Sequence, residues 1–271
     1  MGPHGPSLHV HRQTASAVVA PDPMNHELAI LCHAVKQAGQ QVMRMAEEGF
    51  ETHEKDDGSP VTSADLSVNQ ILKDSLLRHF PQDGWLSEES PDDPIRLEHK
   101  RVWVVDPIDG TKYFMRNIPQ FSISVALVKE SAPALGVVYN PATDELFSAI
   151  AGQGLRFNGT PILVTKPIPP RLRILVNPSR IPRGQFTPYA GRADIQPMGS
   201  IAYTLALVAA GRADGTLNFD LLHEWDVAAG WLLVQEGGGS STDADLQDIL
   251  FNQEDPIVHG IVAVRQGAQK A

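Results

Sequence analysis

The stretch Val102–Phe114, VWVVDPIDGTKYF, decides the predicted fold. It opens with the apolar, mostly β-branched run Val102–Val105, which predicts a buried strand. Two carboxylates, Asp106 and Asp109, follow at the end of this strand with no basic residue between them. Acids at a strand end lie on the rim of a sheet, where ligands bind, and they repel each other. The pattern therefore indicates a counterion that neutralises them.

Gly110 and Thr111 follow Asp109 directly and predict an anion site beside the cation. Glycine lets the backbone approach a ligand closely, and free N–H groups at the start of a helix or turn bind phosphate. The Thr111 hydroxyl is expected to orient a water molecule. A cation on one side and N–H donors on the other together predict a phosphate site.

The spacing of the two acids separates this motif from that of the haloacid dehalogenase phosphatases. Those enzymes place Asp-x-Asp-Gly-Thr after a buried strand, and the first Asp attacks phosphorus. This chain has Asp-x-x-Asp-Gly-Thr, so the additional residue moves Asp106 out of the nucleophile's register. A metal-activated water is therefore the expected nucleophile.

Further acids lie at the edges of other apolar segments. Asp65 lies near the start of a predicted helix, Glu88 and Glu89 lie in LSEES, and Asp226 begins the apolar segment WDVAAG. Carboxylates without a histidine or cysteine cluster select hard cations such as Mg²⁺, Mn²⁺ or Ca²⁺. Each acid alone also fits a solvated turn or a cap, and a helix N-cap explains Asp226 equally well.

Composition excludes several classes of protein. The 271 residues allow one large or two modest domains, and the net charge of −10 argues against a general nucleic-acid binder. Cys32 is the sole cysteine, so no intramolecular disulfide forms, which fits a cytoplasmic location. Cys32 is expected to be a small core residue rather than a nucleophile. No apolar run approaches the length of a membrane span.

Alternating helical and strand patterns predict a layered α/β (α+β) fold in three parts. Residues 1–23 are expected to be a disordered N-terminal extension, with ordered structure beginning near Asn25 as an N-cap. Residues 24–165 are expected to form an α+β domain with the main metal site. Residues 166–271 are expected to form an α/β domain that contributes Asp226 and substrate contacts. The boundary is placed in the Pro-rich stretch TKPIPPR.

Periodicity within these parts predicts individual elements. The helices are expected from about residue 25 to 45, from Ser63 as N-cap to about 80, and over 200–211 and 225–238. The strands are expected at 102–105, 121–129, 134–140, 145–159 with turns at Gly152 and Gly154, 173–177 and 257–264.

Taken together, these motifs resemble the inositol monophosphatase superfamily, which consists of Mg²⁺-dependent, lithium-sensitive phosphatases. The resemblance rests on SEES, DPIDGT and WDVAAG in this order and extends from about residue 25 to 264. SPVTSAD, GQGLRFNGTPI and GSIAYTLALVAAGRADG are also similar to family segments. The resemblance implies the layered αβαβα fold of the sugar phosphatases. It also implies two or three Mg²⁺ ions and inhibition by Li⁺, and by analogy a homodimer is a candidate assembly.

The resemblance also implies a role for each candidate residue. One Mg²⁺ would be held by Glu88, Asp106 and the Ile108 carbonyl, a second by Asp106, Asp109 and Asp226, and a third, weaker one near Asp65 and Glu88. The residues expected in catalysis are Asp65, Glu88 and Thr111, and those expected to contact substrate are Asp109, Gly110, Thr111, Arg180, Ser200 and Asp226.

Finer details favour a CysQ-type 3'(2'),5'-bisphosphate nucleotidase, which converts adenosine 3',5'-bisphosphate to AMP. DGTKYF, KDDGSPVTSAD and NPSR resemble CysQ segments, and Lys112 or Arg180 is expected to meet the second phosphate. A solvated loop explains Lys112 equally well. Ser200 is expected to contact substrate, to cap the following helix, or to do both. Glu224 is a further candidate contact for a sugar hydroxyl.

Two alternatives stay open at this point. One is an inositol or other sugar monophosphatase of the same fold, and the other is a non-catalytic protein that uses this fold for binding. The intact set of acids argues against the second, because a protein without bound cations has no reason to keep such repulsion.

Overall fold

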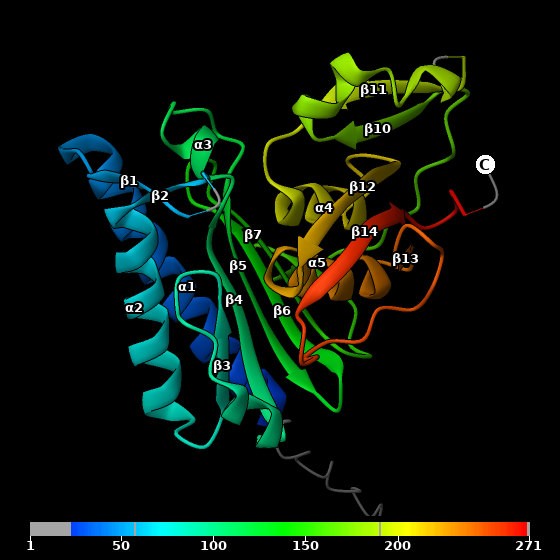
Figure 1. Ribbon diagram of the computed structural model, residues 1–271. Coiled ribbons are helices and arrows are strands. Elements are labelled where there is room, and N and C mark those ends of the chain that lie inside the picture. Colours follow the sequence, from blue (N-terminus) through cyan, green and yellow to red (C-terminus); the bar gives the residue numbers. More distant parts are fainter. Residues whose placement is uncertain (1–22, 57, 190, 270–271) are drawn as a thin grey trace, which may run out of the picture.

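The computed structural model describes residues 23–56, 58–189 and 191–269, and it shows a layered arrangement of helices and sheets (Figure 1). Helices α1 (Pro23–Glu48) and α2 (Ser63–His79) cover one face of a seven-stranded sheet. Helices α4 (Ile201–Ala209) and α5 (Glu224–Glu236) pack between this sheet and a five-stranded one. The predicted layered α/β fold is confirmed.

The large sheet has the strand order β3-β4-β5-β6-β7-β8-β9. β3 pairs with β4 in parallel, and each later pair is antiparallel. Its strands are β3 (Gly84–Ser87), β4 (Arg101–Asp109), β5 (Ser122–Lys129), β6 (Ala132–Asn140), β7 (Glu145–Ile150), β8 (Leu155–Phe157) and β9 (Thr160–Pro161).

The small sheet has the strand order β11-β10-β12-β14-β13. Its strands are β10 (Leu172–Val176), β11 (Ala193–Pro197), β12 (Gly215–His223), β13 (Ser240–Thr242) and β14 (Ile257–Val264). Short elements complete the described chain: β1 (Thr52–Glu54), β2 (Pro60–Thr62), α3 (Thr111–Phe114) and the 3₁₀ helices η1 (Pro94–Glu98), η2 (Pro178–Arg183) and η3 (Thr187–Tyr189).

Strand β4 is apolar along its first part because both of its faces are covered. Val102 and Val104 join the core formed with α4 and α5, whereas Trp103 and Val105 join the core beneath α1 and α2. A strand buried on both faces reads as a continuous apolar run rather than an alternating one. This explains why the quoted stretch begins with four apolar residues.

A bulge in β4 explains the Asp-x-x-Asp spacing. Asp106 pairs with Ser124 and Asp109 pairs with Ser122, so three steps on β4 match two steps on β5. Residues three apart in a regular strand face opposite sides, and one additional residue restores a common side. Pro107 lies inside the bulge, where its missing N–H removes no ladder bond. Asp106 and Asp109 therefore project from the same face.

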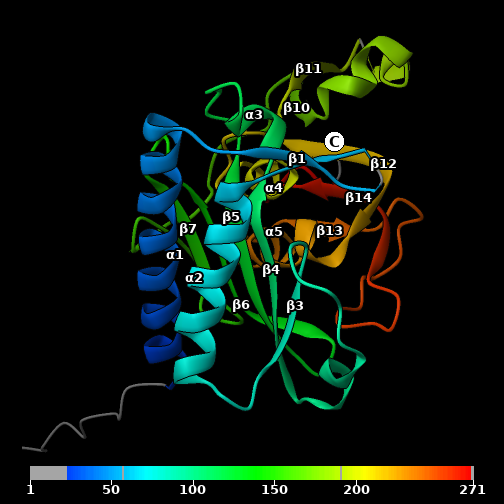
Figure 2. The same ribbon diagram turned by 60° about the vertical axis from the view of Figure 1, so that its left-hand side comes forward.

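Helices α1 and α2 lie side by side on the outer face of the large sheet (Figure 2). Helix α1 buries Leu31, Val35 and Val42, which recur at helical spacing. It begins at Pro23, so the prediction that Asn25 caps it is wrong. Proline suits the first helical turn because its φ is fixed and its N–H is not needed there.

The start of α2 also differs from its prediction. The N-cap is Thr62 rather than Ser63: Thr62 Oγ1 accepts a hydrogen bond from Ala64 N at 3.2 Å, and Asp65 Oδ2 accepts one from Thr62 N at 2.8 Å. This is a capping box, in which the fourth residue holds the cap in return. The box fixes the Asp65 carboxylate at the rim of the sheet.

Several other predictions can be compared with the structure. Strand β12 was not predicted between the last two helices, because Asn218, Asp220 and a register shift interrupt its pattern. Cys32 is half-buried at the edge of the core beneath α1 and α2, and burial raises the pKa of its thiol to about 11, which argues against a nucleophile. No helix in residues 23–56, 58–189 and 191–269 is long and apolar enough to cross a membrane.

The predicted division into parts stays a prediction. The boundary at residues 165 and 166 falls between β9 and β10, where the chain passes from the large sheet to the small one. Of the predicted N-terminal extension, residues 1–22 lie outside the described residues, and Pro23 begins α1.

Candidate active site

Acidic side chains from α2, β4, α5 and the turn after β3 gather at one rim of the large sheet. Burial raises the pKa of four aspartates, and the negative charge of Glu88 raises the pKa of each one further. The four are Asp65 in α2, Asp106 and Asp109 in β4, and Asp226 in α5. Charges shift one another's pKa mainly over short distances in a protein, so the Glu88 carboxylate lies within electrostatic reach of the four aspartates.

The Asp106 carboxylate lies in surroundings in which a bound cation would stabilise its charge. Its side chain is buried, and its Oδ1 atom has no hydrogen-bond partner in the described part of the chain. Burial raises the pKa of Asp106 well above its ordinary value, and the charges of Glu88, Asp109 and Asp226 raise it further. An orphaned carboxylate oxygen in this position is costly unless a positive charge compensates it.

Asp109 is fixed by the start of α4. Its Oδ2 atom accepts hydrogen bonds from Ser200 Oγ and from Ala202 N, both at 2.6 Å. Burial raises the pKa of Asp109 to about 7, although the hydrogen bonds from Ser200 and Ala202 oppose the shift. The contact therefore joins β4 to the helix that precedes the small sheet and orients the Asp109 carboxylate.

Ser200 does not lie where a substrate contact was expected. Its side chain is buried, it donates to Asp109, and its Oγ accepts a hydrogen bond from Tyr203 N at 2.9 Å as the N-cap of α4. Ser122 Oγ lies 3.0 Å from Ser200 Oγ. The predicted capping role is present, and because the buried hydroxyl donates to Asp109 the predicted substrate contact finds no support.

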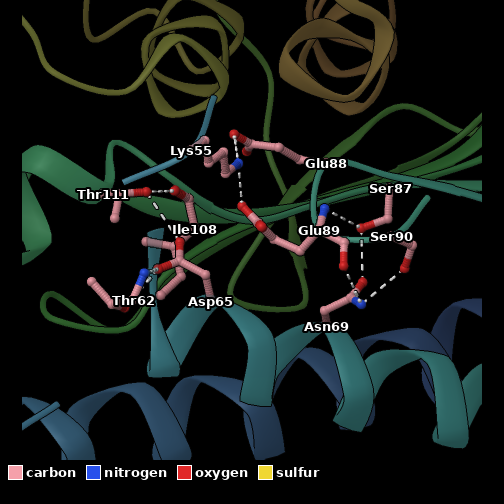
Figure 3. A network of polar contacts seen from close by, with 10 residues as sticks. All are labelled: Lys55, Thr62, Asp65, Asn69, Ser87, Glu88, Glu89, Ser90, Ile108 and Thr111. Carbon is pink, nitrogen blue, oxygen red and sulfur yellow. Dashed lines mark hydrogen bonds and ion pairs between the residues drawn. The ribbon is translucent and has the colours of Figure 1, made fainter. Parts of the chain in front are cut away.

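Asp65 and Thr111, two of the residues expected in catalysis, lie within hydrogen-bonding distance of each other. Thr111 Oγ1 lies 3.1 Å from Asp65 Oδ1 and 3.0 Å from the Ile108 carbonyl oxygen (Figure 3). The other oxygen of Asp65 is held by the N–H and hydroxyl of Thr62. The carboxylate and the hydroxyl are thus held together at the end of β4.

Asp226 is a member of both the α5 capping box and the acidic group. It is the third residue of α5, and its Oδ2 accepts a hydrogen bond from His223 N at 2.7 Å. Burial and the charge of Asp109 raise its pKa well above the ordinary value. The N-cap of α5 is His223, so the prediction that Asp226 is the N-cap is wrong; Asp226 completes the capping box from the third helical position and also belongs to the acidic group.

Glu224 is placed differently from its prediction. It is buried, and its carboxylate accepts hydrogen bonds from the backbone N–H groups of Asn252 and Gln253 at 2.5 and 2.8 Å. Both oxygens are therefore used to hold a loop, and the proposed contact with a sugar hydroxyl finds no support.

Gly110 occupies a position that other residues fit poorly. Its φ is +93°, and an added Cβ would lie 2.8 Å from the Gln120 carbonyl oxygen. The tight turn places Gly110 and Thr111 on the wall of a cleft of about 300 Å³. Other lining residues are Ser59, Glu88, Lys112, Tyr113, Asn177 and Ser179. The predicted phosphate-binding residues therefore border a cleft of ligand size.

The two candidate cations for a second phosphate are not equivalent. Arg180 is paired with Asp220, with Nε 2.6 Å from Oδ2, and is not among the residues that line the cleft. Lys112 lines the cleft, is exposed and has no ion-pair or hydrogen-bond partner within the described ranges. The geometry therefore favours Lys112 and does not favour the predicted Arg180 contact.

Lys55 was not predicted as a site residue. Its Nζ atom lies 2.8 Å from Glu88 Oε1 and 2.6 Å from Glu89 Oε1, between the two carboxylates (Figure 3). Burial alone would lower the pKa of Lys55, but the charge and hydrogen bond of Glu88 and those of Glu89 raise it above its ordinary value. Its positive charge also lowers the pKa of Asp226. The sequence pointed to Lys55 as a site residue only through its place in the polar loop before SPVTSAD.

The residues present fit a hard divalent cation. As the side chains stand, no three His, Cys, Asp or Glu residues of the described chain are grouped closely enough to hold a metal ion. Lys55 engages Glu88, and Asp106 Oδ1 has no partner in the described chain. An all-oxygen donor set with an unpartnered buried carboxylate oxygen is the chemistry that Mg²⁺ selects.

Replacing Lys55 with methionine is expected to tighten Mg²⁺ binding by roughly tenfold, because a positive charge no longer has to be displaced from Glu88. Calorimetric titration with Mg²⁺ measures this change. Lys36→Met, at an exposed position in α1, is the matched control and should leave the affinity unchanged. Unchanged or weaker binding in Lys55→Met would show that the ammonium does not compete with the cation.

The comparison with known proteins agrees with this site. Residues 24–271 match the model of the inositol monophosphatase family, and the chain belongs to that family. Members of the family are phosphatases that hydrolyse phosphomonoesters, and they depend on a metal ion, generally Mg²⁺.

Individual relatives cover most of the chain. It is 36% identical over 239 residues to an inositol-1-monophosphatase of Rhizobium meliloti (strain 1021), which spans 80% of this chain and 85% of the relative. The crystal structure of extragenic suppressor protein suhB from Bartonella henselae matches with a TM-score of 0.79 at 30% identity, covering 89% and 94% of the two chains. CysQ from Bacteroides thetaiotaomicron matches with a TM-score of 0.73 at 24% identity, covering 90% and 98%, which supports the fold alone.

Proposed function

We propose that the chain is a Mg²⁺-dependent phosphomonoester hydrolase whose substrate carries a second phosphate, with conversion of adenosine 3',5'-bisphosphate to AMP as the reaction. The observation that carries this proposal is Lys112, a cation on the wall of the cleft without an acidic partner in the described chain. A phosphate beyond the one that is hydrolysed would neutralise it. An uncharged sugar gives this lysine no partner.

Five residues would hold the cations in this proposal. They are Glu88, Asp106, Ile108 through its carbonyl, Asp109 and Asp226. When bound, Mg²⁺ lowers the pKa of water and offsets the charge of the phosphate. Two or three ions are expected by resemblance to the family, and inhibition by Li⁺ is expected on the same ground.

The remaining residues position the reactants. Asp65 Oδ1, beside the Thr111 hydroxyl, is the expected acceptor for the proton of the attacking water, and burial raises its pKa toward the range useful for this role. Glu88 lies within electrostatic reach of Asp65, and its ion pair with Lys55 has to open before the Glu88 carboxylate binds a cation. The N–H groups of Gly110 and Thr111 would hold the phosphate that is attacked.

The proposal is tested by comparing two substrates. Mg²⁺-dependent release of phosphate from adenosine 3',5'-bisphosphate should show a higher kcat/KM than release from inositol 1-phosphate. The reverse order would contradict the proposed substrate but leave the phosphatase activity in place. Release from neither substrate would favour the non-catalytic alternative.

A second candidate substrate is inositol 1-phosphate or another sugar phosphate. The observation in its favour is the 36% identity with the inositol-1-monophosphatase of Rhizobium meliloti. Under this alternative Lys112 is a solvated loop residue, and its removal would leave the rates for both substrates nearly equal to those of the natural chain.

Lys112→Gln therefore separates the two candidates. It should lower kcat/KM for adenosine 3',5'-bisphosphate by about tenfold, because a charged hydrogen bond to the second phosphate is lost. The rate for adenosine 3'-monophosphate, which lacks that phosphate, should change less than about twofold. Arg180→Gln is the matched control, since Arg180 is committed to Asp220. A larger effect in Arg180→Gln would reverse the assignment.

A homodimeric assembly and a cytoplasmic location stay predictions. The first follows from the family resemblance, and the second from the single cysteine. Sedimentation of the purified chain would test the first.

A further inference from the structure

A second, larger cleft lies at the other end of the large sheet from the acidic group. Its volume is about 570 Å³, which lies within the range of small-molecule sites. Its lining includes Val102 near the start of β4 and Lys129 at the end of β5. Because β4 runs from Arg101 to Asp109 with one bulged residue, its two ends are roughly 23–26 Å apart at the rise of a strand. The second cleft is therefore separate from the catalytic rim.

The lining of this cleft is positively charged. Lys100 is exposed and has no ion-pair or hydrogen-bond partner among residues 23–56, 58–189 and 191–269. Lys129 Nζ contacts Met24 Sδ at 3.1 Å and no carboxylate of the described chain. Arg101 also lines the cleft, but Glu27 and Asp83 neutralise it. Glu130 is the single acidic residue in the lining, against the two lysines.

One wall of the cleft is held rigidly by buried charged groups. Asn252 lies in this wall, and its Oδ1 accepts a hydrogen bond from Arg96 Nη1 at 2.7 Å. Its backbone N–H donates to Glu224 Oε2 at 2.5 Å. Arg96 and Glu224 are each only 1% exposed. With Oδ1 engaged, the Nδ2 donor of Asn252 keeps no partner in the described chain, and a fixed donor lowers the entropic cost of binding a ligand.

The lip of the cleft is a turn with a strained backbone. Glu130 and Ser131 connect β5 to β6 with φ values of +49° and +63°, and both line the cleft. Two successive residues in the left-handed region normally call for asparagine and glycine. Strain of this kind persists where the surrounding structure requires it, often at a ligand site. The turn places Ser131 in the lining of the same cleft as the two lysines.

We propose that this cleft binds a small molecule with a dianionic group of the phosphate class, through Lys100, Lys129, Ser131 and Asn252. Ammonium groups and neutral donors together suit a tetrahedral anion. Since a single carboxylate lines the cleft, it lacks the acids that a metal-assisted hydrolysis needs. The anion is therefore bound there and not hydrolysed.

The test uses phosphonoacetate, an anion that a phosphatase does not hydrolyse. Calorimetric titration into the full-length chain with Mg²⁺ should show two classes of site, and the double variant Lys100→Ala/Lys129→Ala should weaken only one of them, by at least about tenfold. In the metal-free chain the catalytic carboxylates repel anions. Only the class of site that depends on Lys100 and Lys129 should therefore persist.

The matched control is Lys36→Ala/Arg78→Ala, which removes two exposed positive charges elsewhere. It should bind phosphonoacetate like the natural chain. Equal weakening in both double variants would show that binding depends only on the net charge of the protein, and it would overturn the proposal. Absence of saturable binding in the metal-free natural chain would overturn it as well. Thermal unfolding of each variant verifies that it is folded, and neither result depends on which substrate the enzyme hydrolyses.

Discussion

Replacing Asp109 with asparagine is expected to lower kcat by about a thousandfold or more, because the change removes one carboxylate charge from the proposed cation site. Asparagine has nearly the same shape and keeps an oxygen that can accept from Ser200 Oγ and Ala202 N. The fold should therefore be preserved. Steady-state kinetics with saturating Mg²⁺ measures the loss.

The stability of the Asp109→Asn variant gives a second expected result. Burial raises the pKa of Asp109 to about 7, so the folded protein disfavours its charge near neutral pH. Removing that charge should leave the thermal midpoint of the metal-free protein unchanged or higher. Asp248→Asn, at an exposed position, is the matched control and should affect neither quantity. Near-normal turnover in Asp109→Asn would show that the metal assignment is wrong.

Gly110→Ala is expected to lower kcat/KM by about a hundredfold, because small displacements of catalytic groups have effects of this size. The added Cβ would lie 2.8 Å from the Gln120 carbonyl oxygen, and a backbone atom cannot move aside cheaply. Thr111 and the cleft wall would shift with the turn. Kinetics and thermal unfolding together measure the effect.

Gly152→Ala separates the contact from the backbone conformation. Gly152 has a φ of +78° and no neighbouring atom within 4 Å of an added Cβ. Alanine there carries only the left-handed conformational cost of about 1–2 kcal/mol and should leave kcat/KM unchanged. Equal losses of activity in the two variants would contradict the steric explanation for Gly110.

The central part of the fold could be predicted because local pattern and tertiary structure agree there. The run Val102–Val105 is apolar because helices cover both faces of β4, and Asp106 and Asp109 follow at its end. The family segments placed Asp226 at the start of a helix, where the structure has it. The apolar run and the acids that follow it are adjacent in the sequence, so the sequence reveals this part of the site.

Other features could not be predicted because they depend on contacts between distant residues. Lys55 meets Glu88 and Glu89 more than 30 positions away, and nothing in the loop around Lys55 specifies that contact. Arg180 was predicted as a phosphate contact, but its ion pair is with Asp220, 40 positions away, and the sequence does not reveal that contact. The choice of Thr62 over Ser63 as the cap depends on which of two adjacent hydroxyls meets the helix, and the sequence alone does not decide this.

An anomalous diffraction experiment on crystals grown with Mn²⁺ tests the central claim most directly. Mn²⁺ accepts the same oxygen ligands as Mg²⁺ and its anomalous signal locates the ion without reference to the surrounding atoms. We expect peaks among the carboxylates of Glu88, Asp106, Asp109 and Asp226. A map with no peak there, or with peaks only elsewhere on the protein, would contradict the account.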